Sequence, residues 1–326
     1  MTKLKAKLIN HVIVFGMQIL EGIANRVAPS YVRRLGSKID LNISIPTWDQ
    51  KTAKVDIYYP KTERPESGWP VALLIHGGGF RFFSKDSHAL VAYRIAELGY
   101  LTVAMDYRLT PAHPFPFGLI DVLSVYEWVT TEINKWGGNT DELVIAGESA
   151  GANFALGLTL IACGYEAPPM FPEKRQSFKW VIPKKLLLHC GYFQVSGVDK
   201  TRDLSGVHTI IRSRMRMIES NYLPKLRSSP ATEDWGLVDP LIILEKKASE
   251  NQRLSSDFPE VFIPVGSSDP VLTDSKRLSK AIQALQGKET LHIYPNAPHA
   301  LYAMPWHSEY NAIWKDIQSF LVPQAT

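Results

Sequence analysis

The chain has 326 residues, of which 45% are hydrophobic and 21% are charged, and its formal net charge is +4. This length suits one large α/β domain with an appended lid, or two small domains, and the composition argues against extended disorder. The charge is mild and no basic stretch is interleaved with aromatic residues, so we expect no nucleic-acid partner. Cys163 and Cys190 are the only cysteines, and both positions predict buried free thiols, with neither a disulfide framework nor a metal site.

Residues 1–40 carry seven basic and two acidic residues, which gives a local net charge of +5. Apolar residues recur there at helical spacing, from Leu4 to Val27, which predicts a helix with one apolar face. The uninterrupted apolar run 12–17 is too short to span a bilayer, and no clear signal-peptide cleavage site follows it. The pattern favours a lid helix that packs on the domain. It leaves open a basic amphipathic helix that contacts a membrane surface.

After residue 40, short apolar runs alternate with amphipathic stretches, which predicts a mostly parallel sheet with helices on both faces. The expected strands are 42–45, 54–59, 71–75, 101–105, 143–146, 186–189, 261–265 and 290–294. The expected helices are 87–98, 118–135, 152–162, 273–285 and 307–321.

Residues 194–257 interrupt this alternation with helical patterns and no clear strand. We interpret them as a lid inserted at the carboxyl end of the sheet. The predicted organisation is therefore an N-terminal lid segment (1–40), a first part of the core (41–193), a helical lid insertion (194–257) and a second part of the core (258–326).

A serine lies between two glycines in Gly147-Glu148-Ser149-Ala150-Gly151, after a predicted strand and before a predicted helix. This is the nucleophile-elbow pattern. The turn is so tight that it strains the serine backbone, and the glycines leave room for the strand and the helix to pass each other. We therefore expect the Ser149 hydroxyl at the carboxyl edge of the sheet.

A serine hydroxyl needs a base that takes its proton and an acid that orients this base. In the chain order serine, acid, histidine, the base belongs in a loop after the last strand, and His299 fits that place. Asp269 follows the strand 261–265 through a glycine turn, whereas Asp274 suits a helix cap. We predict Ser149, Asp269 and His299 as the catalytic residues.

Consecutive glycines follow the predicted strand 71–75. Their N–H groups can turn two donors toward one oxygen, and the N–H of Ala150 would add a third at a helix N-terminus. We predict Gly77, Gly78 and Ala150 as the oxyanion hole. A phosphate-binding loop is disfavoured, because no Gly-Lys-Ser/Thr follows and no Gly-x-Gly-x-x-Gly is present.

Four motifs together resemble the hormone-sensitive-lipase-like branch of the α/β-hydrolase superfamily, which comprises esterases and deacetylases with a His-Gly-Gly-Gly motif. The motifs, in family order, are His76-Gly77-Gly78-Gly79; Asp106-Tyr107-Arg108-Leu109 with Pro114-Phe115-Pro116; Gly147-Glu148-Ser149-Ala150-Gly151; and Asp269-Pro270 with His299. The resemblance covers residues 39–321. Glu148 stands where the family often has aspartate, and Ala152 where it often has glycine.

The resemblance implies an α/β-hydrolase fold: a mostly parallel eight-stranded sheet flanked by helices, with a helical lid made of the N-terminus and an insertion before the acid strand. It also implies that residues 106–116 buttress the glycine loop and shape the pocket wall.

These residues predict a serine hydrolase that cleaves carboxylic esters through an acyl-enzyme, without a metal or a cofactor. Aromatic residues near the expected loops favour an apolar substrate of small to medium size; they are Phe80, Phe82, Phe83, Phe115, Phe117 and Tyr192. A lactonase, an amidase, an acyltransferase or a ligand-binding protein on the same scaffold stays open. We expect a cytoplasmic location, and leave open membrane association through residues 1–40 and a homodimer.

Overall fold

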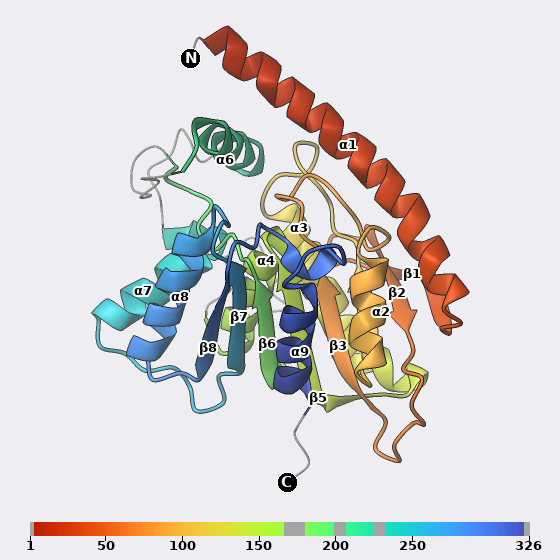
Figure 1. Cartoon of the computed structure of the whole chain (residues 1–326). Coiled ribbons are helices and arrows are strands. Elements are labelled where there is room, and N and C mark those ends of the chain that lie inside the picture. The colour runs from red at the N-terminus through yellow and green to blue at the C-terminus, as the bar shows by residue number, and fades with distance from the viewer. Residues whose placement is uncertain (1–2, 166–179, 199–206, 224–232, 323–326) are drawn as a thin grey trace.

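An eight-stranded sheet is the centre of the computed structural model, which describes residues 3–165, 180–198, 207–223 and 233–322 (Figure 1). Its strands are β1 (Ile39–Pro46), β2 (Thr52–Tyr58), β3 (Trp69–Ile75), β4 (Leu101–Met105), β5 (Gly138–Glu148), β6 (Lys185–His189), β7 (Glu260–Gly266) and β8 (Glu289–Tyr294), in the order β1-β2-β4-β3-β5-β6-β7-β8. β2 pairs antiparallel with β1 and β4, and the other neighbouring pairs are parallel. The mostly parallel sheet predicted from the sequence is confirmed.

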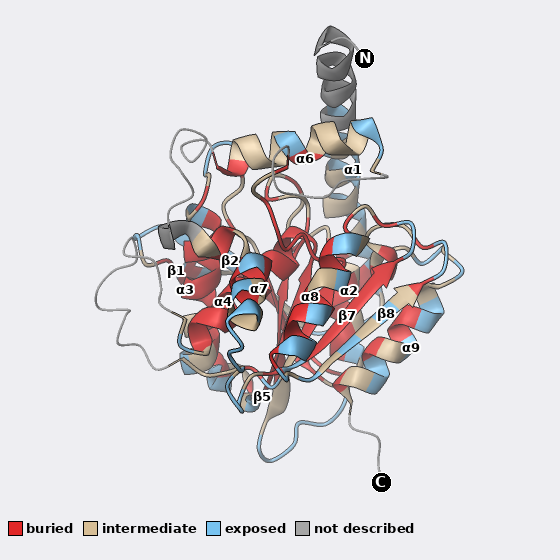
Figure 2. Cartoon of the chain, turned by 90° about the vertical axis from the view of Figure 1, so that its left-hand side faces the viewer, coloured by how far each residue is buried: buried red, intermediate tan, exposed pale blue. Residues whose placement is uncertain are grey.

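Helices cover both faces of the sheet (Figures 1 and 2). The α-helices are α1 (Lys3–Arg34), α2 (Ala89–Glu97), α3 (Phe117–Glu132), α4 (Ala150–Ala162), α6 (Thr209–Tyr222), α7 (Pro240–Ser249), α8 (Leu272–Ala284) and α9 (Tyr310–Leu321), and the short 3₁₀ turns are η1 (Ile133–Trp136), η3 (Glu233–Val238) and η4 (Leu301–Ala303).

Two hydrophobic cores form because successive side chains of a strand point to opposite faces. In β3, Leu73 and Ile75 belong to the core that includes residues of α3, α4 and α8, whereas Ala72 and Leu74 belong to the core that includes residues of α2 and α9. Burial on both faces explains why this strand is a continuous apolar run in the sequence. Figure 2 shows the buried residues gathered along the strands and on the inner sides of the helices.

α1 and α6 lie over the edge of the sheet at which the parallel strands end (Figure 1). α1 is fixed there by its Glu21 carboxylate, which accepts the N–H of Phe83 (2.9 Å), and by its Asn25 amide oxygen, which accepts the hydroxyl of Ser84 (2.8 Å). α7 packs instead beside α8 (Figure 1). The lid boundaries stay a prediction, and residues 199–206 and 224–232 of the predicted insertion lie outside the described residues.

No helix within the described ranges combines the length and the apolar character that a membrane crossing requires. Both cysteines are free. The prediction of burial holds for Cys190 and is wrong for Cys163, which is half-buried. Cys163 is the residue at which α4 ends and the chain begins to leave the core.

A buried ion pair fixes the loop that follows the glycine run. Lys85 Nζ lies 3.0 Å from Asp56 Oδ2, and both side chains are 1% exposed. The backbone N–H of Lys85 also donates to Asp106 Oδ1 (2.8 Å). The Asp106 motif is thereby tied to the loop beyond Gly79.

We expect Lys85→Met to lower the free energy of unfolding by about 3–5 kcal/mol, because Asp56 is left as a buried charge without its cation. Chemical denaturation followed by circular dichroism measures this loss. The matched control is Lys135→Met, which removes an exposed ion pair with Glu132 and should cost less than about 1 kcal/mol. Equal losses in the two variants would contradict the role given to Lys85.

Candidate active site

Ser149 occupies a strained turn between β5 and α4. Its backbone has φ 52° and ψ −111°, a conformation that a residue with a side chain rarely adopts. The neighbouring glycines allow the turn: a Cβ on Gly147 would lie 2.5 Å from the carbonyl oxygen of Gly151, and one on Gly151 would lie 2.1 Å from that of Ile75. The structure therefore has the elbow geometry that the motif predicts, with Ser149 7% exposed.

Asp269 and His299 form a hydrogen-bonded pair beside this turn. His299 Nδ1 lies 2.9 Å from Asp269 Oδ2 and 3.0 Å from Oδ1. The N–H of Val271 donates to the same carboxylate (2.9 Å), whose side chain is completely buried. The two loops meet because Gly266 has no side chain, and a Cβ there would lie 2.0 Å from the carbonyl oxygen of Ala297. The structure thus brings together the predicted acid and base.

The glycine loop after β3 has the tight geometry that side chains would prevent. Gly78 has φ +113°, and a Cβ on it would lie 2.1 Å from the carbonyl oxygen of Phe82. A Cβ on Gly77 would lie 2.4 Å from Glu148 Oε1. The loop therefore passes directly over the residue that precedes Ser149. The N–H groups of Gly77, Gly78 and Ala150 as oxyanion donors stay a prediction.

Tyr107 supports the glycine loop from below. Its hydroxyl donates to the carbonyl oxygen of His76 (2.9 Å), and the two rings stack with centroids 4.2 Å apart. Burial lowers the pKa of His76 to about 3, so its ring is neutral and packs as an aromatic group. This contact matches the buttress that the resemblance implies for residues 106–116.

A family model described as alpha/beta hydrolase fold matches residues 72–303. The chain belongs to this family. The match spans β3 to the loop of His299, and so includes every predicted catalytic and oxyanion residue. The resemblance to the hormone-sensitive-lipase-like branch and the predicted α/β-hydrolase fold are confirmed.

The relatives of this α/β-hydrolase include named esterases. Carboxylesterase NlhH of Mycobacterium tuberculosis is 34% identical over 118 residues. These residues are 36% of this chain and 36% of that relative, so the chain matches only about a third of the relative's length. Versiconal hemiacetal acetate esterase of Dothistroma septosporum is 25% identical over 304 residues, or 89% of this chain and 85% of that protein. The structure titled brefeldin A esterase, a bacterial homologue of human hormone sensitive lipase, has the same fold, with a TM-score of 0.70 at 19% identity over 87% of this chain and 76% of that one.

Cys190 is the residue of this candidate site that the sequence analysis missed. It directly follows β6, has φ 40°, and its Sγ lies 3.9 Å from His299 Nε2. The carbonyl of His189, the residue before Cys190, accepts the N–H of Ser149 (3.0 Å). Within the described residues, no hydrogen bond joins the His299 ring to the Ser149 hydroxyl. Contacts between a catalytic base and its nucleophile often tighten only when substrate is bound. A residue at the end of the strand next to the elbow strand could have been placed at this edge from topology alone.

The pKa values of these side chains separate their roles in the candidate site. Burial raises the pKa of the Cys190 thiol to about 11, so at neutral pH it is protonated and a poor nucleophile. Burial of His299 opposes its protonation, but the Sγ of Cys190, as a hydrogen-bond acceptor, and the Asp269 carboxylate favour it, and the pKa of His299 is raised above its ordinary value. Burial would also raise the pKa of Glu148, but His88, whose Nε2 lies 3.6 Å from Glu148 Oε2, and the nearby His189 and His299 lower it to about 2. Glu148 is therefore a paired anion behind the glycine loop.

Cys190, Asp269 and His299 also have donor atoms that lie within 4.8 Å of one another. Sulfur, imidazole and carboxylate are the ligand types that zinc takes in proteins. The absence of a metal requirement therefore stays a prediction, with a chelator as its test.

Proposed function

We propose that the protein is a carboxylic ester hydrolase that works through a serine acyl-enzyme. The observation that carries this proposal is the Asp269–His299 pair at the sheet edge where the strained turn holds Ser149. A hydrolase of this kind needs the three groups at one edge of one sheet. The esterases among the relatives support the same reaction class.

Each step follows from the position of a side chain. His299 Nε2 takes the proton of Ser149 Oγ as the oxygen attacks the ester carbonyl, while Asp269 holds the imidazole by Nδ1–H. The N–H groups of Gly77, Gly78 and Ala150 stabilise the oxyanion. The imidazolium then gives its proton to the departing alcohol oxygen. Water, deprotonated by His299, attacks the acyl-enzyme and releases the acid and Ser149.

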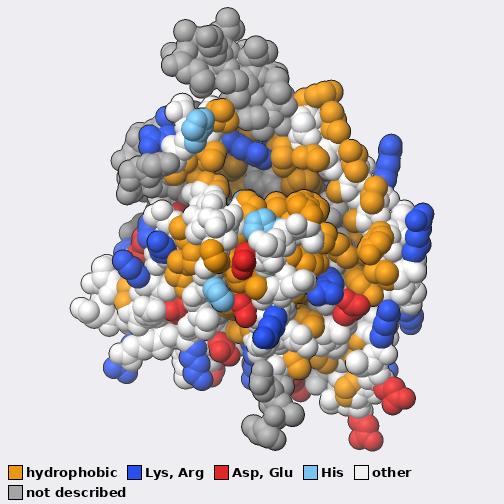
Figure 3. Space-filling view, in the orientation of Figure 1, with side chains coloured by type: hydrophobic (Ala, Val, Ile, Leu, Met, Phe, Trp, Pro, Cys, Tyr) orange, Lys and Arg blue, Asp and Glu red, His pale blue; other side chains and the backbone are white. Residues whose placement is uncertain are grey.

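An apolar ester is the proposed substrate. On the face in Figure 3, hydrophobic side chains gather around a hollow below the N-terminal helix. Of the six aromatic residues considered above, Phe80 and Phe115 are buried in the core with Tyr222, so they shape the wall from behind. Lactone or amide cleavage and acyl transfer would pass through the same acyl-enzyme, and a ligand-binding protein would need no such triad.

The location and assembly predicted from residues 1–40 stay predictions. α1 leaves large apolar side chains more than 45% exposed; they are Phe15, Ile19, Leu20, Ile23, Val27 and Tyr31. This supports membrane contact through the basic amphipathic helix, while the bonds from Glu21 and Asn25 support the lid. If the protein does not contact a membrane, we propose that it is cytoplasmic and that a homodimer covers these side chains.

We expect the purified protein to hydrolyse 4-nitrophenyl acetate and butyrate, with a rate that 1,10-phenanthroline and EDTA leave unchanged. Release of 4-nitrophenolate, read by absorbance with and without prolonged chelator dialysis, measures both points. Because the serine, the imidazole and backbone donors carry every step, no step needs a Lewis acid. Loss of activity on dialysis, restored by added zinc, would contradict this and assign Cys190, Asp269 and His299 to a metal.

A further inference from the structure

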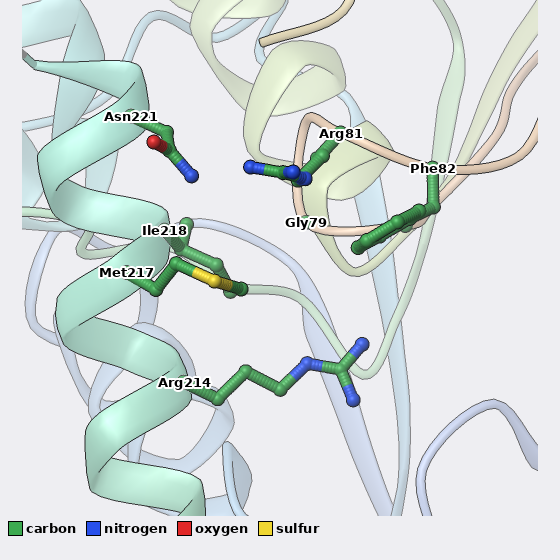
Figure 4. Close-up of a pocket in the computed structure, with 8 residues that line it drawn as sticks. Gly79, Arg81, Phe82, Arg214, Met217, Ile218 and Asn221 are labelled. Carbon is green, nitrogen blue, oxygen red and sulfur yellow. The ribbon is translucent and has the colours of Figure 1, made fainter. Parts of the chain in front are cut away.

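A narrow pocket lies between parts of the glycine loop and α6 (Figure 4). It is lined by Gly78, Gly79, Arg81, Phe82, Arg214, Met217, Ile218 and Asn221. The four lining residues from α6 stand at positions i, i+3, i+4 and i+7, which is one face of a helix. A Cβ on Gly79 would lie 3.1 Å from Ile218 Cδ1, so this face rests directly on the loop.

Each polar side chain of this pocket has hydrogen-bond donors, and two of the three are cations. Arg81 and Arg214 contribute two guanidinium groups, and Figure 4 shows both reaching from opposite sides into the space between the loop and the helix. The Nδ2 of Asn221 is buried and has no hydrogen-bond partner among the described residues. None of the lining residues is Asp or Glu.

Arg214 is a half-buried cation without an anion beside it. Among the residues that the structure describes, no carboxylate forms an ion pair with its guanidinium. Burial lowers the pKa of Arg214, which is the direction expected when a cation loses water and gains no carboxylate. Such a group is stabilised by any anion that enters the pocket.

The apolar side chains suit the chain that would carry the anion. Met217, Ile218 and Phe82 line the pocket between the two guanidinium groups (Figure 4). The Cζ of Arg81 lies 5.5 Å from the centroid of the Phe82 ring, a contact that holds the guanidinium over the pocket wall. The methylene groups of a ligand would therefore contact these apolar side chains, and a planar anionic group at its end would meet the N–H donors.

We propose that this pocket binds a free carboxylate of the substrate, so that the preferred esters carry a second, ionised carboxyl group. The inference rests on the proposed function, because the pocket shares Gly78 and Gly79 with the predicted oxyanion loop. A carboxylate matches these donors, because a guanidinium binds a carboxylate through two parallel hydrogen bonds in a planar, bidentate geometry. The amide N–H of Asn221 supplies a further hydrogen bond.

Matched esters test the preference. On the acyl side, 4-nitrophenyl hemiglutarate is compared with 4-nitrophenyl 5-methylhexanoate, in which an isopropyl group replaces the carboxylate. On the alcohol side, 4-acetoxybutanoate is compared with 4-methylpentyl acetate. We expect kcat/KM of the wild-type protein to favour the anionic ester by at least about tenfold in one series, and that series identifies the side of the ester that faces Arg214.

Three variants separate the pocket from general charge. Arg214→Met keeps an unbranched side chain but removes the guanidinium, and it should lower the preference at least about tenfold. Asn221→Asp should lower it too, because it adds a carboxylate to the pocket. Arg216→Met is the matched control, since it removes the same charge from an exposed position of α6 outside the pocket, and it should leave the preference unchanged.

Two results would overturn the inference: no preference in either series, or equal losses in Arg214→Met and Arg216→Met. In both cases hydrolysis of the neutral esters would continue, and the proposed function would stand. A wild-type protein that hydrolyses none of the four esters would overturn the inference together with the proposed function.

Discussion

Replacing Ser149 with alanine will lower kcat for a 4-nitrophenyl ester by about 10⁵- to 10⁶-fold, because no other group can form the acyl-enzyme. The variant should fold normally, since a hydroxyl is removed without opening a large cavity and the helix that follows keeps its contacts. Steady-state kinetics on the variant and on the wild-type protein, with the thermal midpoints of both, measure the two expectations.

Cys190→Ala is the matched control for this variant. The thiol lies 3.9 Å from His299 Nε2, the nitrogen that is proposed to take the proton of Ser149. Its pKa of about 11 keeps it neutral, and we expect its loss to change kcat by less than about tenfold. Two results would contradict the assignment of Ser149 as the nucleophile: near-wild-type turnover in Ser149→Ala, or loss of turnover in a Cys190→Ala variant of normal stability.

Asp269→Asn will lower kcat by about 10⁴-fold, because an amide no longer fixes the imidazole in the tautomer that can accept the serine proton. The pH profile should change as well. The base works only when it is neutral, that is, above its pKa. Burial lowers that pKa, whereas the hydrogen bond to Cys190 Sγ and the Asp269 carboxylate raise it. Removing the carboxylate takes away one raising contribution, so the acid limb of kcat/KM should move to lower pH.

Asp274→Asn is the control for the acid, because Asp274 is the competing carboxyl in the same stretch of sequence. It is buried in the first turn of α8 and accepts the N–H of Gln194 (3.3 Å), so its loss should affect stability more than kcat. A larger loss of kcat in Asp274→Asn than in Asp269→Asn, or an acid limb that moves upward in Asp269→Asn, would refute the pairing proposed for His299.

The sequence predicts the sheet, the elbow and the acid–base pair well, for a topological reason. Parallel strands end at one edge, so residues that directly follow β5, β7 and β8 must meet there whatever the lengths of the intervening helices. Gly147, Gly151 and Gly266 mark the points at which backbones approach too closely for a side chain. Motif spacing therefore places Ser149, Asp269 and His299 without any knowledge of packing.

The sequence does not predict the contacts made across loops. Cys190 lies against His299 because the chain turns with positive φ after β6, which no local pattern indicates. Likewise, Arg212, Arg214 and Arg216 alternate along α6, and only the packing of the helix on Gly79 shows that Arg214 faces the pocket. Both contacts depend on which face of a segment meets its neighbour. Single polar residues at such positions form no periodic pattern in the sequence, so the facing side cannot be predicted from it.

Labelling with a fluorophosphonate, followed by proteolysis and tandem mass spectrometry, tests the central claim most directly. The account predicts one adduct, on Ser149, in the wild-type protein and in Cys190→Ala, and none in Ser149→Ala. An adduct on any other residue of the active wild-type enzyme, or undiminished labelling of Ser149→Ala, would contradict the claim that Ser149 is the nucleophile.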